Sequence, residues 1–259
     1  MTVDLAVPRP EMIGTFLLAF VRVSGLVFAT PVLGNRNVPA MVRILLSLLI
    51  TMAVLPLLPV SPIAPESEGF IPAMIAEVVL GGFLGFVGVL LFAAAELGGQ
   101  LGGYQMGFAI ANVMNPESEL QVSVFSSLMG LTALLTFVMS DGHHLFVAAL
   151  VKSFRSLPLG SFAVDAVRTG SLVRMGTATF AYGLALSAPV LAITMFITIA
   201  LGILSRSMPQ MDVFFMGFAV NAVAGVLMFV LSVPFFLAGV QKLIGILDNE
   251  LLVILNIAR

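Results

Sequence analysis

The amino-acid sequence predicts an all-α, membrane-associated fold, and two observations carry this prediction. Hydrophobic residues make up 60% of the 259-residue chain, charged residues make up 9%, and the mean hydropathy is +1.15. Ordinary soluble domains are about 45–50% apolar and about 25% charged. The apolar residues also form long runs, without the alternation that marks the strands of a membrane barrel. A chain so poor in charge must cover itself with lipid or with apolar protein, which excludes a soluble globular enzyme.

Six long apolar stretches are expected to form helices, because a backbone in lipid must satisfy its own hydrogen bonds. We expect the first stretch to be retained, since it lacks the basic leader and the cleavage site of a signal peptide. No repeat or long linker divides the sequence, so we expect a single domain over residues 1–259. The stretches cover residues 12–32, 44–58, 70–95, 122–139, 175–204 and 213–240.

The lengths of these stretches fit a simple bundle of spanning helices poorly. Residues 44–58 give a helix of about 22 Å and residues 175–204 give one of about 45 Å, at 1.5 Å per residue. The hydrocarbon core of a bilayer is about 30 Å thick. Pro189 and Pro234 are expected to kink the last two helices and to absorb part of this mismatch.

The charged and aromatic residues are also unusual for such a bundle. Basic residues occupy the first and fourth connections, which fall on opposite sides if every stretch crosses, although the positive-inside rule favours one side. One stretch is therefore expected not to cross conventionally. The chain has no Trp and 2 Tyr beside 21 Phe, so the usual interfacial aromatic belts are missing. Helices that pack mainly on other proteins explain all these features. The basic residues are Arg36, Arg43, Lys152, Arg155, Arg168 and Arg174.

The composition excludes several kinds of site. A net charge of −2 offers no extended basic surface for nucleic acid. Without cysteine there is no thiolate metal site or disulfide, and 2 histidines leave little for a metal. The metal-hydrolase pattern HExxH, the serine-hydrolase pattern GxSxG and the Walker pattern are all missing. We therefore expect no catalytic residue, metal or cofactor.

A glycine-rich helix is predicted from residue 70 onward, with a helical pattern that can run to Asn115. Small residues at every fourth position keep near one face and let another backbone approach closely. Glu96, Gln100 and Tyr104 form a polar edge beside this stripe. Packing alone is one interpretation of the stripe, and a functional role is the other. The stripe contains Ala95, Gly99, Gly103, Gly107 and Ala111, with Gly81 and Gly85 earlier, and Gly81, Gly85, Gly99 and Gly103 are the predicted helix-packing positions.

A sharp break follows this helix at Asn115 and Pro116. The residue before proline avoids the α region, and Asn followed by Pro and acidic residues suits the start of a new helix. The segment is expected to form a hairpin tip or re-entrant element, which membrane depth tolerates only inside protein or beside a cavity. Met106 and Met114 are conformable enough to seal such a gap. A second break at residues 205–212 is expected to be a tight turn.

Ionisable residues at membrane depth are candidate functional sites, and here they are Arg22, Glu77 and Glu96. Glu77 has two open interpretations, one as the partner of Arg22 and one as a residue that faces water or another subunit. His143 and His144 are expected to be helix-cap or loop residues, because adjacent histidines lie about 100° apart on a helix and would not bind one metal. A small-solute or ion transporter is the alternative class, although the flanks of the two breaks share no repeat.

Residues 241–259 are predicted to form a moderately amphipathic helix. Apolar Leu and Ile alternate there with Lys242, Asp248, Asn249 and Glu250. Such a helix lies either on the lipid surface or against another subunit, and the sequence leaves both interpretations open.

The sequence resembles the FliR family of flagellar type III export-gate proteins across nearly the whole chain. Asn115 and Asp212 are mild departures, where the family often has Asp and Asn. The matching pieces occur in the family's order: Arg22, Pro31 and Val38-Pro39-Ala40-Met41-Val42-Arg43; residues 96–108, ending Gly103-Tyr104-Gln105-Met106-Gly107-Phe108; Asn115-Pro116-Glu117-Ser118; Asp141-Gly142-His143-His144-Leu145 with Ser153-Phe154; and Pro209-Gln210-Met211-Asp212-Val213-Phe214.

This resemblance implies a non-enzymatic subunit that joins FliP-like and FliQ-like subunits in a helical assembly of bent hairpins, with an FlhB-like protein at the cytoplasmic mouth. It implies an inner-membrane basal-body location that extends toward the periplasm, in contact with membrane lipid and exported unfolded flagellar proteins. The related injectisome gate subunit is an alternative, and Leu157-Pro158-Leu159-Gly160 favours the flagellar branch. The segment that matches residues 103–118 resembles the family's channel plug, with Tyr104, Gln105, Met106, Gly107, Phe108, Ala109, Ile110, Ala111, Asn112, Val113, Met114, Asn115 and Pro116 as its residues.

Overall fold

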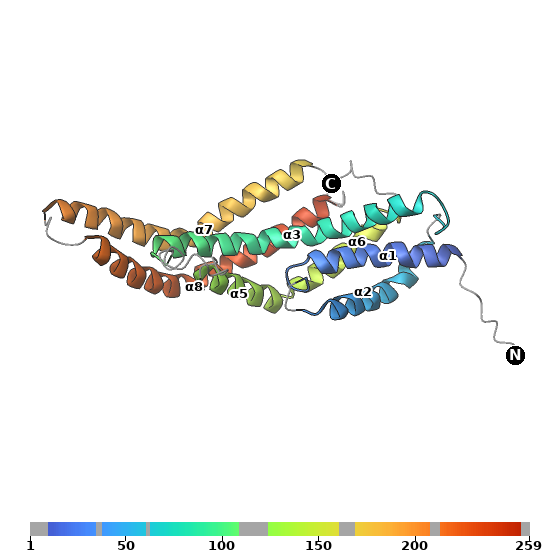
Figure 1. The fold of residues 1–259 in the computed structure, drawn as a ribbon, viewed down its shortest axis with the longest axis horizontal. Helices are drawn as coiled ribbons and strands as arrows, with labels where there is room; N and C mark the ends of the chain where they lie inside the picture. Colours follow the sequence, from blue (N-terminus) through green and yellow to red (C-terminus); the bar gives the residue numbers. More distant parts are fainter. Residues whose placement is uncertain are drawn as a thin grey trace, which may run out of the picture. The chain divides into compact units, whose positions relative to one another are not determined.

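The computed structural model describes residues 10–34, 38–60, 63–108, 124–160, 169–207 and 213–254. All regular secondary structure within these ranges is helical. The all-α prediction is confirmed (Figure 1). The helices are α1 (Pro10–Ala29), α2 (Ala40–Val54), the short 3-10 helix η1 (Leu55–Leu57), α3 (Phe70–Gln105), α5 (Val124–Met139), α6 (Gly142–Ser156), α7 (Thr169–Ser207) and α8 (Val213–Ile254).

The described residues form two compact units. Unit 1 combines residues of Met1–Val89, Asp141–Val173 and Ile246–Arg259, and unit 2 combines Leu90–Ser140 and Arg174–Gly245. Helix α3 contributes its first half to unit 1 and its second half to unit 2. Folding as one domain over residues 1–259 stays a prediction.

Helices α1 and α3 run parallel in unit 1, with α6 antiparallel to α3. Gly14 of α1 lies near Phe70 at the start of α3, and Gly85 of α3 lies near Ala29 at the end of α1. Phe146, early in α6, lies against Gly88 of α3, whereas Gly160, just beyond the end of α6, lies near Ala73, at the start of α3. The buried core between these helices includes Leu18, Val23, Leu80, Leu84, Leu150 and Phe154.

Helix α6 is the element that the hydropathy of the sequence did not predict. It follows α5 after a short break, and the two helices are bent by 66°. Neither helix is long enough to span a membrane alone, but the two together are as long and as apolar as a membrane-spanning helix. Lys152 and Arg155 dilute the hydropathy of α6, which explains why its sequence does not stand out. The described residues thus contain five candidate spans, or six if the bent pair is one span.

Helices α7 and α8 are longer than predicted, with 39 and 42 residues. Residues 241–254 are helical, as predicted, and they form the last part of α8, which continues through Gln241 to Ile254; residues 255–259 lie outside the described part. The hydropathy changes near residue 240, but no proline or cap there stops the backbone. At 1.5 Å per residue, the two helices measure about 58 and 63 Å, well beyond the hydrocarbon core of about 30 Å.

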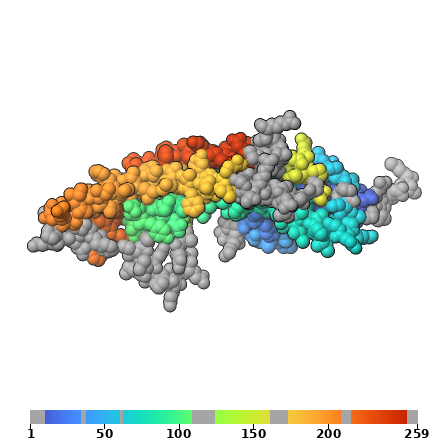
Figure 2. Space-filling view, turned by 90° about the horizontal axis from the view of Figure 1, so that it is seen from above, coloured from blue at the N-terminus to red at the C-terminus, as the bar shows by residue number. Residues whose placement is uncertain are grey.

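Much of the apolar surface of the long helices is uncovered. In the most apolar stretch of α7, only 22% is buried. The corresponding buried share is 28% in α8 and 17% in the span that contains α2. Figure 2 shows side chains of α7, in gold to orange, forming part of the surface. Such large exposed apolar faces require lipid or partner protein as cover.

The basic regions of unit 1 can be located along the α1–α3 pair. Gly160, at the start of the fourth connection, lies against Ile63 of the second connection, whereas the first connection starts beside Gly85 of α3. The basic first connection and the basic end of α6 therefore lie at opposite ends of the α1–α3 pair. That one stretch does not cross conventionally stays a prediction, and the bent pair of α5 and α6 is compatible with it.

Candidate functional site: the end of α3 and a buried charge cluster

Helix α3 ends in a glycine-dependent cap at the start of the predicted plug. Gly107 has φ +90°, its N–H donates to the carbonyl of Tyr104 at 3.0 Å, and Phe108 N–H donates to the carbonyl of Gly103 at 3.0 Å. These two hydrogen bonds define a Schellman motif, which terminates a helix at a left-handed glycine. The predicted continuation of the helical pattern to Asn115 is therefore wrong, because Gly107 stops the α-helix after Gln105.

The capped end of α3 is held against α8 in unit 2. Met106 is fully buried, and a Cβ placed on Gly225 of α8 would lie 2.4 Å from the Cγ of Met106. A Cβ on Gly107 would lie 2.5 Å from the ring of Phe218. By contrast, Tyr104 and Phe108 are exposed. The first residues of the predicted plug thus combine one buried methionine with two exposed aromatic side chains. The predicted plug residues 109–116 lie outside the described part.

Substitution of Gly107 by alanine is expected to loosen this anchor. An L residue at φ +90° is strained by about 1–2 kcal/mol, and the added Cβ collides with Phe218. We expect G107A to raise the protease sensitivity of the α3 end in membranes. Gly202→Ala in α7 is the matched control, because a Cβ there meets nothing within 4 Å. Equal sensitivity in both variants would contradict the anchoring role.

The predicted stripe of small residues lies against α5 in unit 2. A Cβ on Gly99 would lie 2.6 Å from the Cα of Ser126, and Gly103 is buried. The Ser126 hydroxyl donates to the carbonyl of Glu96 at 2.8 Å. The side chain of Glu96 is on the exposed side and lies against Gly130.

The earlier glycines, Gly81 and Gly85, lie between α3 and α1 in unit 1. A Cβ on Gly81 would lie 2.0 Å from the carbonyl oxygen of Arg22, and one on Gly85 would lie 2.8 Å from that of Leu26. Gly25 of α1 approaches the carbonyl of Val78 in the same way, at 2.7 Å. The two helix backbones are therefore in direct contact, which only small residues permit.

This close approach brings together a fully buried ion pair, Arg22 of α1 and Glu77 of α3. Both side chains have a relative exposure of 0%. The guanidinium binds the carboxylate in a bidentate manner, through Nε to Oε2 and through Nη2 to Oε1, the latter at 2.9 Å. Of the two interpretations left open by the sequence, pairing with Arg22 is the one that the structure shows for Glu77.

Helix α6 and the turn after it complete the cluster. Arg22 Nη1 donates to Ser153 Oγ at 3.3 Å, and Nη2 donates to the carbonyl of Leu157 at 3.0 Å. Gly160 N–H donates to Glu77 Oε1 at 2.9 Å. The Arg22 guanidinium also lies over the ring of Phe154, 4.5 Å from its centroid. The guanidinium and the carboxylate are thus both hydrogen-bonded within the protein, as the burial of charged groups requires.

The arrangement indicates a structural clamp rather than a proton or substrate site. Both carboxylate oxygens accept hydrogen bonds, and the cluster joins α1, α3 and α6. Sequence reasoning named Arg22 and Glu77 as candidate charges, whereas Ser153, Leu157 and Gly160 entered only as pieces of the family resemblance and not as partners of this pair. Gly160 carries a usable signal, because it follows Pro158 and has φ +78°, a conformation that favours glycine.

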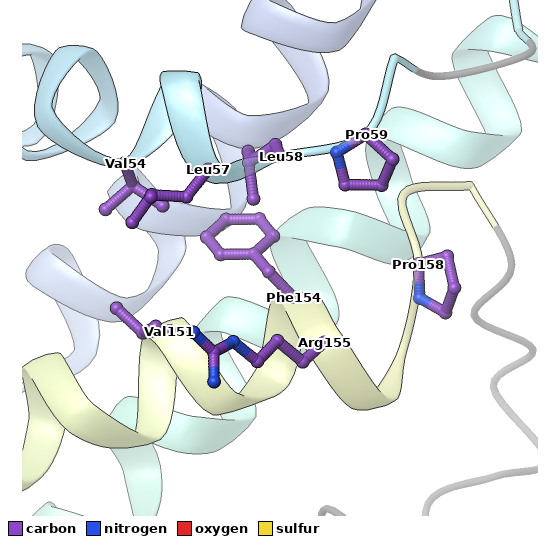
Figure 3. Close-up of a pocket in the computed structure, with 8 residues that line it drawn as sticks. All are labelled: Val54, Leu57, Leu58, Pro59, Val151, Phe154, Arg155 and Pro158. Carbon is purple, nitrogen blue, oxygen red and sulfur yellow. The ribbon is translucent and has the colours of Figure 1, made fainter.

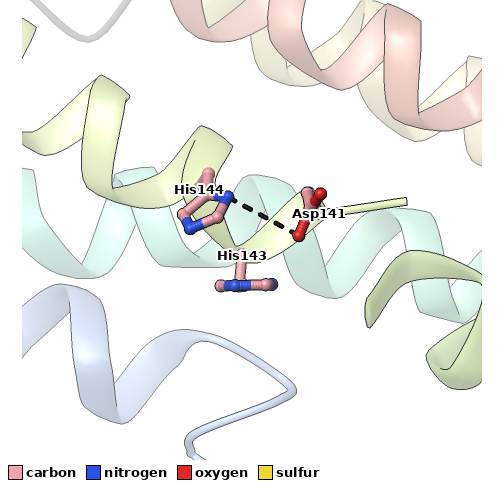
Figure 4. Close-up of side chains that lie close together, drawn as sticks. All are labelled: Asp141, His143 and His144. Carbon is pink, nitrogen blue, oxygen red and sulfur yellow. Dashed lines mark ion pairs between the residues drawn. The ribbon is translucent and has the colours of Figure 1, made fainter. Parts of the chain in front are cut away.

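Asp141, His143 and His144 form an exposed cluster at the start of α6. Their ligand atoms all lie within 4.8 Å of one another, so the expectation that the adjacent histidines cannot converge is wrong. Asp141 adopts φ 54°, which turns its carboxylate toward His144, 3.7 Å from Nδ1 (Figure 4). The cluster stands at a helix N-terminus, whose dipole disfavours a bound cation. Freedom from metal stays a prediction.

Together, the long apolar helices and the internally paired charges define a polytopic, all-α membrane protein. Residues 13–246 match the family described as bacterial export proteins, family 1. The chain is 30% identical over 213 residues to the flagellar biosynthetic protein FliR of Escherichia coli K12, covering 82% of each chain. It is 32% identical to FliR of Pectobacterium carotovorum over 222 residues, covering 86% of this chain and 85% of the relative. FliR of Bacillus subtilis is 26% identical over 240 residues, covering 91% of this chain and 92% of the relative.

The chain belongs to the FliR family of bacterial export proteins, which are non-enzymatic membrane proteins of the type III export gate. The family resemblance predicted from the sequence is confirmed, and so is the prediction that the chain is not an enzyme.

Proposed function

We propose that this protein is a subunit of the flagellar type III export gate and forms part of the channel through which unfolded proteins leave the cell. Residues 104–116 are its plug. The observation that carries this proposal is the capped end of α3, where Gly107 stops the helix and Met106 is anchored on α8. A channel closure needs a fixed base from which an irregular segment can extend, and this end of α3 supplies one. Membership of the FliR family supports the same conclusion.

The partners proposed for this subunit are FliP-like and FliQ-like proteins, with an FlhB-like protein at the cytoplasmic mouth. The uncovered apolar faces of α7 and α8 support extensive packing on other subunits. Helices of about 60 Å exceed the bilayer core by about twofold, which supports a location in the inner membrane with an extension toward the periplasm. There the subunit is part of the basal body, lines the path of unfolded flagellar proteins and contacts membrane lipid at the periphery of the complex.

Two alternatives remain as competing proposals. The equivalent injectisome gate subunit would have the same architecture, but the relatives described above are all flagellar biosynthetic proteins. A small-solute or ion transporter would need available charges at membrane depth. Arg22 and Glu77 are not available, because they bind each other and α6, which leaves Glu96 as the one exposed candidate of the three named from the sequence.

Deletion of residues 109–114 tests the plug. We expect the assembled complex to survive and to leak ions or small molecules, because the anchored end of α3 remains while the segment beyond it is shortened. Ion flux or single-channel conductance of the complex in lipid provides the measurement. A transporter would instead lose uptake of its substrate without a leak.

A conservative change within the same segment serves as the control for this deletion. Ile110→Leu with Val113→Ile keeps both the length and the apolar bulk, so its conductance should equal that of the natural sequence. Copurification gives an independent check of the assembly. A tagged chain that leaves the membrane alone and well folded in detergent would contradict the gate proposal.

A further inference from the structure

A pocket of about 210 Å³ opens in unit 1 between the end of α2 and the end of α6. Seven of its eight lining residues are apolar, and the eighth is Arg155. Figure 3 shows residues of the α2–η1 end facing Val151 and Phe154 of α6, with Arg155 beside Val151 and Pro158 at the far edge. The lining residues are Val54, Leu57, Leu58, Pro59, Val151, Phe154, Arg155 and Pro158.

The pocket lies where two candidate membrane segments end. The span that contains α2 ends at Leu57, and the bent pair of α5 and α6 ends at Ser156. Where such segments cross a bilayer, their ends lie at the boundary between its hydrocarbon and its headgroups. An apolar pocket at that depth would meet both the acyl chain and the phosphate of a phospholipid.

Arg155 supplies an available cation at this depth. It lies in the last turn of α6, it is exposed, and it forms no ion pair with any residue that the structure describes. Glu66 and Glu68, in the neighbouring connection, are exposed and do not neutralise it within the described contacts. An arginine next to a membrane surface attracts the phosphate of an anionic lipid.

The α2–η1 segment also carries exposed apolar side chains. Leu49, Met52 and Leu57 are all more than half exposed. Leu49 and Met52 lie about one turn apart on α2, and Leu57, in η1, lines the pocket itself. Leu57 therefore offers an acyl chain an exposed apolar contact within the pocket lining.

We propose that this pocket binds an anionic phospholipid, with the lipid phosphate on Arg155 and an acyl chain against Val54, Leu57 and Val151. A volume of 210 Å³ corresponds to roughly seven water volumes, which suits a segment of an acyl chain rather than a whole lipid. Phe154 forms the inner wall and carries the Arg22 guanidinium on its ring. The bound lipid therefore lies directly against the clamp that joins α1, α3 and α6.

The test uses the full chain in its copurified membrane complex, reconstituted with photoreactive phosphatidylglycerol or photoreactive phosphatidylcholine. Peptides that carry residues 54–59 and 151–158 are analysed for lipid adducts. We expect phosphatidylglycerol to label these peptides about fivefold more than phosphatidylcholine, the gain expected from one arginine at a membrane surface. Arg155→Gln should reduce phosphatidylglycerol labelling to the phosphatidylcholine level. Arg206→Gln is the matched control, because Arg206 is an exposed residue in the last turn of α7.

A second pair of variants tests the apolar part of the site. Val151→Phe fills the pocket and should lower labelling by both lipids, whereas Val147→Phe, one turn earlier on α6 and outside the pocket, should not. Equal labelling by the two lipids in the natural sequence, or labelling unaffected by R155Q, would overturn the proposal. A photoreactive phenylalanine derivative at Leu57 that forms adducts with a protein subunit instead of lipid would also overturn it.

Discussion

Replacement of Arg22 by methionine is expected to be the most damaging single change in unit 1. It leaves the Glu77 carboxylate fully buried without its counter-charge, and removal of one partner of a buried ion pair costs about 3–5 kcal/mol. The carbonyl of Leu157 loses its donor as well. We expect R22M to lower strongly both the amount of protein in membranes and the midpoint of thermal denaturation of the purified complex.

A second substitution distinguishes a lost ion pair from lost packing. Glu77→Gln removes the stranded charge but keeps an amide oxygen that accepts from Gly160 N–H. The double variant R22M/E77Q should therefore be more stable than R22M, by about 2 kcal/mol, since the unpaired buried charge is gone. Arg206→Met, at an exposed position in α7, should change stability little. If E77Q adds to the damage of R22M, the two side chains are not coupled as the structure shows.

Hydropathy and residue spacing predicted most helices of this fold. They failed for a helix of mixed polarity and for the position of a helix end. Long apolar runs identify α1, α2, α3, α5, α7 and α8, because burial in lipid requires both apolar side chains and helical backbone. Helix α6 was missed because Lys152 and Arg155 give its sequence a mixed character. The continuation of α8 past Val240 was missed because hydropathy reports the surroundings of a helix and not the position where its backbone stops.

The candidate sites were predicted to a similar extent. The residue types of Arg22 and Glu77 marked them as candidates, but their pairing depends on the parallel packing of α1 and α3, separated by 55 residues along the chain. The hydrogen bonds of Arg22 to Ser153 and to the carbonyl of Leu157 could not be predicted, since one partner is an ordinary helical serine and the other is a backbone atom. The end of α3 illustrates the opposite case, because Gly107 was noted as part of a packing stripe while its positive φ made it a helix stop.

The convergence of Asp141, His143 and His144 shows a further limit of spacing arguments. Angles on an ideal helix separate adjacent histidines, but these two stand in the first turn of α6, where their flexible side chains can turn toward each other. Their ring centroids are 4.2 Å apart. Helix angles therefore constrain Cβ directions more than they constrain the ends of side chains.

Gly81→Ala is expected to separate α1 from α3 and to dismantle the clamp between them. The new Cβ would lie 2.0 Å from the carbonyl oxygen of Arg22 and 3.0 Å from the amide nitrogen of Leu26. Both are backbone atoms, so no side-chain rotation relieves the collision and the helices must move apart. Overpacking of this kind costs about 1–3 kcal/mol, and occasionally more. The same movement lengthens the hydrogen bonds between Arg22 and Glu77, so we expect a loss at the upper end of this range.

The neighbouring residue provides a closely matched control for this prediction. Gly82 lies in the same helix, and a Cβ there meets nothing within 4 Å. Because alanine favours an α-helix over glycine by about 0.5–1 kcal/mol, Gly82→Ala should leave stability unchanged or raise it slightly. Thermal denaturation of the purified complex and protein levels in membranes compare the two variants directly. A similar response of G81A and G82A would mean that α1 and α3 do not approach at Gly81, whereas opposite responses one residue apart would locate the contact on a single face of α3.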